Sequence, residues 1–511
     1  MSQQSHTTIG WKDWCIDAFD EARDEDKLIL LSITASWCHW CHVMDRTTYS
    51  DPIVMRIIEE RFVPIRVDGD RRPDIQKCYL LGGWPTTAIL TPDGKIVNGW
   101  TYLPPDALIT MLCETNIKYH ERQTNPILHI KRNEERWANE IATGETDRLP
   151  LDAGLLSEIS DALLQEFDPW HGGFGTEPKF PYPDAIKFAL LQFRRNGRRD
   201  MLEVATKTLD GMAGIYDDVW GGFYRYSEDG QWTKPHYEKM LYIQAGLLDD
   251  YLDGYEIIKK DAYSQIAMGI RQYVEHWLSD TQKGGFYASQ HADVRGQEPS
   301  SPLVPGEEYY TKNEQERLRI GIPQVDKTVF TDWNAMMVSA YLHFDQIIGD
   351  SGARNFAFKT LDRLLSENLV EGKMCHYVDD IPCVLGMLSD QVYFAHSLID
   401  AYQVSRNGDY LEHAIRLADY IVDKLEDKEN GGFYFMQPDP NALGELKRKH
   451  KPLDENAHAS RLLTRLHHHT GESTYLRIAS RALQAIAHPR IVKSVSGAPF
   501  GVALDSYLNP P

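Results

Sequence analysis

The sequence predicts a two-domain protein in which a small α/β domain precedes a large all-helical domain. The chain has 511 residues, more than one hydrophobic core usually organises. Short apolar runs rich in branched side chains lie within the first hundred residues, which is typical of buried strands. From about residue 150 onward, apolar residues instead recur every three or four positions, which is typical of helices. We therefore expect domains at residues 1–120 and 151–511, joined by a linker or connecting helix at 121–150.

The composition restricts the classes of partner. Hydrophobic residues make up 42% of the chain and charged residues 25%, as in an ordinary globular protein. The formal net charge of −21 argues against nucleic acid or an anionic membrane as a partner, because both require a dense positive field. The first thirty residues lack a signal-peptide pattern, and no apolar run approaches the ~18 residues of a membrane helix. We predict a cytoplasmic protein, and the oligomeric state stays open.

A pair of cysteines at a strand-to-helix junction is the first candidate site. Cys38 and Cys41 follow an apolar run at 27–35, and no Gly or Pro interrupts the chain directly after them. Unpaired N–H groups and the positive end of a helix dipole there would stabilise a thiolate at Cys38. We therefore predict that Cys38 is a nucleophile and that Cys41 is its resolving partner.

The rest of the small domain fits a thioredoxin-like fold. Further strands are predicted at 61–70 and 86–94, and a closing helix at 104–120. Trp84 and Pro85 directly precede the third strand, and a proline there resembles the cis-proline of thioredoxin-like folds. These two residues are candidates for substrate binding beside the dithiol.

Other interpretations of the cysteine motif stay open. Cys38-x-x-Cys41-His42 matches a c-type haem attachment site, although that chemistry normally follows export. Zinc could bind Cys38 and Cys41 together with His39 or His42, although the chain has no second Cys-x-x-Cys motif. The fold could also persist without any redox role for the pair. Our prediction is a dithiol site without a metal or another cofactor.

The helical domain is predicted to consist of about eleven helices. They lie at 151–167, 183–195, 201–215, 238–256, 262–278, 333–348, 353–369, 387–406, 409–425, 456–469 and 474–488. A Gly-Gly-Phe repeat follows this pattern and occurs at 172–174, 221–223, 284–286 and 431–433. The first three copies are about fifty to sixty residues apart, the length of one helical hairpin. About six such hairpins would close into an (α/α)6 toroid around a central cavity.

Polar and aromatic residues near the repeats are candidate site residues of the toroid. His236 and Glu238 precede an apolar helix and could act as a general base and acid, although a buried histidine near a helix cap is equally compatible. Trp220 and Tyr224 flank a Gly-Gly-Phe copy and could bind a sugar ring at the rim, or could simply anchor the loop.

A second group of candidates lies further along the chain. Asp326 and Lys327 precede Trp333 and Asn334 at a predicted helix start. Asp390 lies inside an apolar helix, where a carboxylate is costly unless it is paired or functional. We predict catalytic roles for Asp326 and Asp390 and substrate contacts for Lys327, Trp333 and Asn334.

Several separated motifs share a pattern with one known family. They are Cys38–Met44, Arg72–Asp74, Gly82–Pro85, Leu90–Gly94, Pro178–Pro181, Gly221–Ser227, Pro235–Tyr242 and Trp333–Asn334. On these motifs the chain resembles the spermatogenesis-associated protein 20 family, called YyaL in bacteria, over nearly its whole length. The resemblance implies a thioredoxin-like domain joined to a six-hairpin toroid related to glycosidases and sugar epimerases. The chain departs from the family at Ile243-Gln244, where Asp-Asn is usual, and at Gln290-His291, where acidic residues are usual.

Three hypotheses of function follow. In the first, the protein is a thiol-disulfide oxidoreductase whose toroid binds a ligand or a partner, with a protein thiol as the reacting group. In the second, the toroid is an epimerase, isomerase or hydrolase of a small carbohydrate-like molecule, and the thioredoxin-like domain is structural. In the third, the protein is a non-catalytic binding scaffold.

Overall fold

A computed structural model describes residues 8–121, 148–295 and 303–510, which form two compact units. The first unit contains residues 8–121 together with 438–449, and the second contains the other described residues. Segment 438–449 is expected from the sequence to lie in the helical domain, so its packing in the first unit is a difference from that expectation. The predicted linker at 121–150 lies, except at its ends, outside the described residues.

The first unit is built on a four-stranded mixed sheet with the order β2-β1-β3-β4. Its strands are β1 (Leu28–Thr34), β2 (Phe62–Asp68), β3 (Thr86–Leu90) and β4 (Ile96–Trp100). β1 and β2 are parallel, whereas β3 is antiparallel to both of its neighbours. β4 was not predicted, because it is short, only partly buried and contains Gly99.

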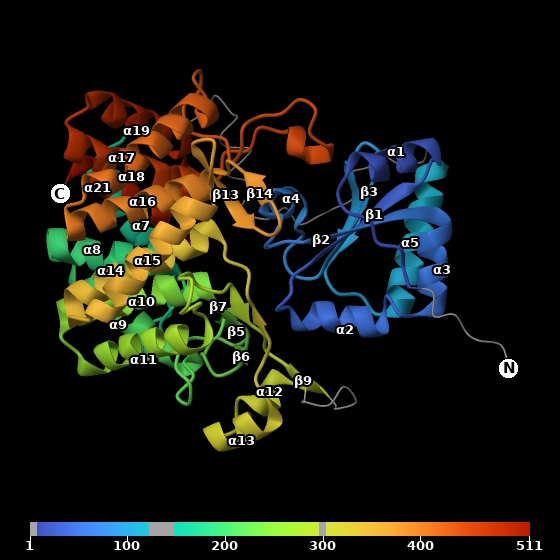
Figure 1. Ribbon diagram of the computed structural model, residues 1–511, viewed down its shortest axis with the longest axis horizontal. Coiled ribbons are helices and arrows are strands. Elements are labelled where there is room, and N and C mark those ends of the chain that lie inside the picture. The colour runs from blue at the N-terminus through green and yellow to red at the C-terminus, as the bar shows by residue number, and fades with distance from the viewer. Residues whose placement is uncertain (1–7, 122–147, 296–302, 511) are drawn as a thin grey trace. The chain divides into compact units, whose positions relative to one another are not determined.

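Helices cover both faces of this sheet (Figure 1). They are α1 (Ile16–Asp24), α2 (His39–Thr47), α3 (Pro52–Arg61), α4 (Pro73–Tyr79) and α5 (Pro105–His120). Leu28 and Leu30 of β1 pack with α3 and α5, and Ile29 and Leu31 pack with α1 and α4. Because alternate residues of a strand point to opposite faces, β1 is buried on both sides. The predicted thioredoxin-like fold is confirmed.

Segment 438–449 completes the core of the first unit. It contains the short helix η3 (Gly444–Lys447), and Leu443 and Leu446 pack against the cluster formed by α1, α4 and β1. The Tyr79 hydroxyl donates a hydrogen bond to the Gly94 carbonyl at 2.8 Å and accepts one from the Glu445 N–H at 2.7 Å. A polar contact therefore joins this segment to α4 within an apolar core.

The second unit is a closed ring of six inner helices. They are α8 (Pro183–Asn196), α10 (Leu241–Ile258), α14 (Thr331–Ile348), α16 (Leu388–Ser405), α18 (Leu453–Thr470) and α21 (Ala498–Leu508). Each packs against the next in this order, and α21 packs against α8 to close the ring. α21 was not predicted, because eight of its eleven residues are buried and it has no periodic apolar stripe.

Six outer helices each pack on one inner helix, as an (α/α)6 toroid requires. They are α7 (Ala153–Glu166), α9 (Arg199–Met212), α11 (Asp261–Trp277), α15 (Ser351–Glu367), α17 (Gly408–Tyr420) and α19 (Ser473–Ile486). The predicted toroid is confirmed. Its apolar stripes and hairpin spacing were visible in the sequence because each helix buries one face against its partner.

The loops of the toroid contain short elements. The helical ones are η1 (Ala213–Ile215), α12 (Gly306–Tyr309), α13 (Glu314–Ile320), η2 (Ile421–Leu425), α20 (Pro489–Val492) and η4 (Val495–Gly497). The strands are β5 (Tyr226–Ser227), β6 (Pro235–His236), β7 (Lys239–Met240), β8 (Ser289–Gln290), β9 (Val294–Arg295), β10 (Leu303–Val304), β11 (Val325–Asp326), β12 (Leu369–Val370), β13 (Lys373–Val378) and β14 (Pro382–Leu385).

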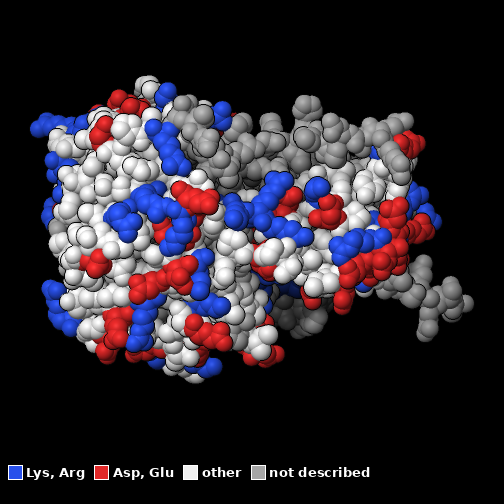
Figure 2. Space-filling view, turned by 90° about the horizontal axis from the view of Figure 1, so that it is seen from above, with Lys and Arg blue, Asp and Glu red and all other residues white. Residues whose placement is uncertain are grey.

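The surface mixes both signs of charge. On the face drawn in Figure 2, Lys and Arg side chains lie next to Asp and Glu side chains over the described part of the surface. Neighbouring charges of opposite sign there partly cancel one another's fields. Among the described helices, none is both long enough and apolar enough to cross a membrane.

Candidate functional site

The Gly-Gly-Phe loops share one ionic arrangement. In the second copy, the Lys239 ammonium donates hydrogen bonds to Asp217 and to the Gly221 carbonyl, both at 2.7 Å. Gly221 has a φ of +79°, and a Cβ added there would lie 2.3 Å from the Gly269 carbonyl oxygen, so only glycine fits. The same arrangement joins Lys179 to Asp168 and Gly172, Arg363 to Asp280 and Gly284, and Lys451 to Asp427 and Gly431. The repeat therefore has a structural role, because each copy fixes its loop through a cation, an aspartate and a glycine carbonyl.

Side-chain amides from the following inner helices hold three of these loops and the strand β13. Gln244 accepts a hydrogen bond from the Phe223 N–H at 2.8 Å and donates one to the Phe223 carbonyl at 2.7 Å. Asn334 pairs in this way with Phe286, Gln391 with Met374, and Asn456 with Phe433. Asn334, a predicted substrate contact, is fully buried and engaged in these backbone hydrogen bonds. Gln244 has the same role at the position where the family usually has Asn.

His236 and Glu238 lie together on and beside β6. His236 Nε2 is 2.7 Å from Glu228, and its Nδ1 is 3.6 Å from Glu238, which is 2% exposed. Burial by itself lowers the pKa of His236, but the Glu238 and Glu228 carboxylates outweigh this and raise it above its usual value. His236 and Glu238 therefore form a histidine–carboxylate pair.

The other predicted toroid residues form local contacts. Asp326 accepts hydrogen bonds from the N–H and the hydroxyl of Thr328 at 3.0 and 2.7 Å. The Lys327 ammonium lies 5.7 Å from the Tyr287 ring centre. The Trp333 ring packs against Tyr242 at 4.9 Å. These residues lie near the starts of the inner helices.

The predicted rim aromatics are buried inside an aromatic cluster. Trp220 packs against Trp277 at 4.6 Å, with the Arg317 guanidinium 5.1 Å from its ring. Tyr224 is 5% exposed and packs against Tyr237 and Tyr310. Both residues therefore act as loop anchors, one of the two roles that the sequence left open.

The cysteine pair forms a disulfide at the start of α2. Cys38 and Cys41 are bonded to one another, and the Cys41 N–H lies 3.1 Å from the Cys38 sulfur that caps the helix. The Trp84–Pro85 peptide bond is cis, as the resemblance implied. The Trp84 ring packs edge-on against Trp37 at 5.4 Å. In this state both sulfurs are bonded to each other, so neither is a metal-ligating thiolate.

The inner helices line an open cavity of about 830 Å3, which we call the lumen. The charged and imidazole side chains that line it are Asp184, Lys187, Arg194, Arg195, Asp249, Asp250, Asp253, His343, His396, Asp400, Asp454, His458, Arg461, Arg465 and Asp505. None of the predicted catalytic residues is among the described residues that line it. Sequence patterns miss these residues because they come from six helices and form no local motif.

Two histidine–carboxylate pairs lie in the lumen. His343 Nδ1 is 2.6 Å from Asp249, which also pairs with Lys187. Burial lowers the pKa of His343, but the Asp249 carboxylate outweighs burial and raises it above its usual value. His458 Nε2 is 3.7 Å from Asp184. Burial raises the pKa of Asp184, but His458 outweighs burial and lowers it. Asp249 therefore orients His343 by a hydrogen bond, and Asp184 lies within ion-pair distance of His458.

A third histidine and two arginines complete the polar lining. Burial and the neighbouring Arg465 charge hold the pKa of His396 well below its usual value, so His396 is neutral. Arg465 Nη1 lies 3.0 Å from His396 Nδ1 and also pairs with Asp400. Arg461 forms no hydrogen bond or ion pair with any residue in the described ranges. Its guanidinium donors therefore have no described protein acceptor.

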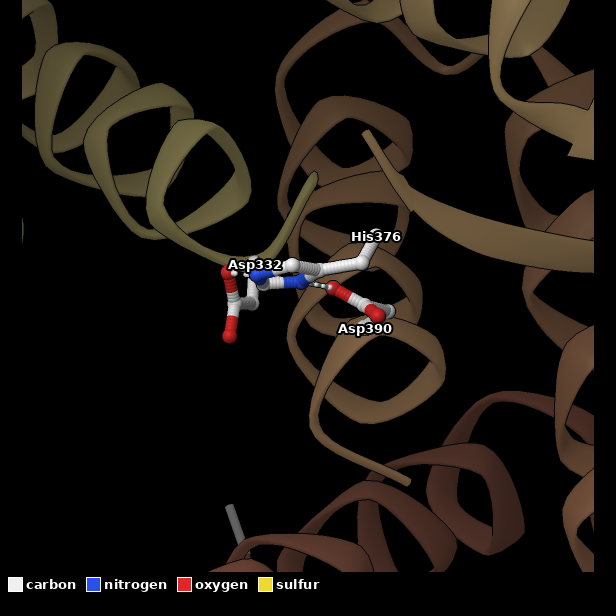
Figure 3. A group of neighbouring side chains, drawn as sticks. All are labelled: Asp332, His376 and Asp390. Carbon is white, nitrogen blue, oxygen red and sulfur yellow. Dashed lines mark hydrogen bonds and ion pairs between the residues drawn. The ribbon is translucent and has the colours of Figure 1, made fainter. Parts of the chain in front are cut away.

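A further polar cluster joins the starts of two inner helices to a strand (Figure 3). His376 of β13 lies between Asp332 of α14 and Asp390 of α16. Its Nδ1 is 2.9 Å from Asp390 and 3.8 Å from Asp332. Burial raises the pKa of Asp390 to about 6. Among the described residues, this is the cluster whose ligand atoms are close enough to hold a metal ion. The sequence singled out Asp390 but not His376, because nothing local marks its partner.

These features define a thioredoxin-like domain with a Cys-x-x-Cys disulfide, joined to an (α/α)6 toroid with a polar lumen. Residues 1–138 match the family model Thioredox_DsbH, described as "Protein of unknown function, DUF255". The chain is 28% identical to human spermatogenesis-associated protein 20 over 93% of its own length and 76% of that protein. The predicted resemblance to the spermatogenesis-associated protein 20 family is confirmed.

Solved structures are similar to the toroid in fold. A D-mannose isomerase superposes with a TM-score of 0.54 at 11% identity, covering 72% of this chain and 100% of that one. The cellobiose 2-epimerase of Spirochaeta thermophila superposes with a TM-score of 0.54 at 15% identity, covering 74% and 99%. At these identities the similarity concerns the fold alone.

Proposed function

We propose that the lumen binds a small carbohydrate-like substrate and epimerises or isomerises it by proton transfer next to its carbonyl group. The observation that carries this proposal is that two histidines with neighbouring carboxylates, His343 and His458, line one cavity. A cavity of about 830 Å3 lies within the range of small-molecule sites. A D-mannose isomerase and a cellobiose 2-epimerase share the fold of this toroid.

The polar lining suits hydroxyl groups. A sugar hydroxyl both donates and accepts hydrogen bonds, so it needs acceptors and donors side by side. Asp184 and Asp400 supply acceptors, and Arg461 supplies donors that no described protein group uses. This mixture favours a polyhydroxylated ligand over an apolar one.

One of the two histidines can act as a general base and the other as a general acid. His458, which lies beside Asp184, accepts the proton from the carbon next to the substrate carbonyl, while His343 donates its proton to the carbonyl oxygen. The protonated histidine then gives a proton back to the enediol. Addition to the opposite face of the same carbon gives an epimer, and addition to the former carbonyl carbon gives an isomer. In both cases one enediol hydroxyl loses its proton to the deprotonated histidine as the carbonyl forms again. Substrate and product have the same composition, so the step balances without a further reactant.

Deuterium exchange tests this proposal. The full chain is incubated in deuterated water with a panel of aldoses, ketoses and disaccharides, and proton NMR follows loss of the signal next to the carbonyl. We expect exchange that falls about 100-fold or more in His458→Gln. His468→Gln, at an exposed position of the same helix, is the matched control and should retain exchange. Equal exchange by both variants, with folds intact by circular dichroism, would exclude the role of His458.

A second candidate function is thiol-disulfide exchange, because Cys38 and Cys41 close a disulfide at the N-terminus of α2. A partner dithiol would reduce this disulfide and become a disulfide itself, with the Cys38 thiolate stabilised by the Cys41 N–H. Reduced model dithiol peptides should be oxidised stoichiometrically by wild type and not by Cys38→Ser. If wild type shows neither sugar epimerisation or isomerisation nor thiol-disulfide exchange, the results would favour the hypothesis of a non-catalytic binding scaffold.

A further inference from the structure

Three ligand-type side chains from distant parts of the chain converge away from the lumen lining. Asp332, His376 and Asp390 are 8%, 2% and 0% exposed. Their ligand atoms all lie within 4.8 Å of one another. We propose that these three side chains bind one divalent first-row metal ion, with Mn²⁺ or Zn²⁺ as the fitting ions.

The distances suit a shared ion. Metal–ligand bonds of about 2.0–2.2 Å put neighbouring ligand atoms about 3 to 3.6 Å apart. His376 Nδ1 is 2.9 Å from Asp390 and 3.8 Å from Asp332, so small side-chain shifts would seat the ion. Figure 3 shows that the histidine ring lies between the two carboxyl groups.

The charges also favour a cation. Two carboxyl groups face one imidazole, which can supply at most one positive charge. The Asp390 Oδ2 atom is buried and has no hydrogen-bond partner among the described residues. A buried carboxylate oxygen without a partner is costly, and a divalent ion would satisfy it.

The donor set indicates the class of ion. One imidazole nitrogen with two carboxylate oxygens suits Mn²⁺ or Zn²⁺ and includes no thiolate, which copper(I) prefers. The ion would join α14, α16 and β13 at one point. The proposal is independent of the lumen, because none of the three ligands is among the described residues lining it.

Metal titration of the full chain tests the site. Protein treated with a chelator is dialysed against Mn²⁺ or Zn²⁺, and bound metal is measured by atomic absorption. We expect one equivalent per chain and a loss of affinity of 100-fold or more in Asp390→Asn and in His376→Gln. Glu412→Gln, an exposed carboxylate on α17, is the control and should bind like wild type.

Two further measurements keep the test decisive. Asp332→Asn changes the most exposed of the three ligands, so it tests the site if Asp390→Asn and His376→Gln do not fold. For Mn²⁺, the electron paramagnetic resonance signal of the free ion should fall on binding to wild type. Failure of wild type to bind either ion, or unchanged binding by Asp332→Asn, would overturn the proposal.

Discussion

His343 Nδ1 lies 2.6 Å from Asp249 Oδ1, and this pair joins α14 to α10 within the lumen. Asp249 also pairs with Lys187 of α8, so one carboxylate connects three of the six inner helices. Burial raises the pKa of Asp249, but the charges of Lys187 and His343 hold it far below its usual value. The pair therefore stays ionic, and it contributes to stability as well as to the proposed chemistry.

The His343–Asp249 pair makes stability depend on pH. The pKa of folded His343 is raised above that of the unfolded chain, so its contribution is full below the unfolded value and is lost as pH rises through the folded value. The difference in free energy of unfolding between wild type and His343→Gln should therefore shrink between about pH 6 and about pH 9. Urea denaturation at both pH values measures it. A difference that grows with pH would contradict the assignment.

Removal of Asp217 should destabilise the toroid strongly. Asp217 is buried and pairs with Lys239 at 2.7 Å and with Arg317 at 2.8 Å. Asp217→Ala would leave two buried cations without their carboxylate, at a cost of about 3–5 kcal/mol. Urea denaturation should show this loss, and Asp218→Ala, at the exposed neighbouring position, should change stability little. Similar losses in both variants would argue against the buried ion network.

Removal of the Gln244 side-chain amide should lower the free energy of unfolding nearly as much as removal of Asp217. Gln244→Leu would leave the buried N–H and carbonyl of Phe223 without partners, which costs about 2–4 kcal/mol. Thermal unfolding should show a lower midpoint than in wild type. Gln265→Leu, an exposed position on α11, is the matched control. Gln244→Asn distinguishes amide chemistry from volume, since it keeps the amide but shortens its reach.

The Tyr79 hydroxyl should protect segment 438–449 from proteolysis. Tyr79→Phe would leave the Glu445 N–H without its acceptor, a loss of about 1–3 kcal/mol. Trypsin should then cleave faster after Lys447 and Arg448, as mass spectrometry of the fragments would show. Tyr119→Phe in α5 of the same unit is the control. Equal cleavage rates in both variants would show that apolar contacts alone hold the segment.

Local sequence patterns predicted most of the fold, because apolar runs, glycine positions and buried charges each reflect constraints between residues that are neighbours along the chain. The run at 27–35 and the cysteines after it predicted β1 and the start of α2, since a buried strand needs a continuous apolar run. The Gly-Gly-Phe copies predicted the hairpin spacing, since glycine is required where Gly221 approaches Gly269. Asp390 was singled out correctly as a buried carboxylate, since burial of a charge is visible in an apolar helix.

The amino-acid sequence is sufficient to predict the two folds, the dithiol motif and the family resemblance, because these depend on neighbours along the chain. Three contacts emerge only in the folded protein: 438–449 packs with the first unit, α21 closes the ring, and His376 contacts Asp390. The lumen pairs His343–Asp249 and His458–Asp184 likewise come from separate helices. Such contacts depend on ring closure and helix packing, which bring distant residues together without any local signal.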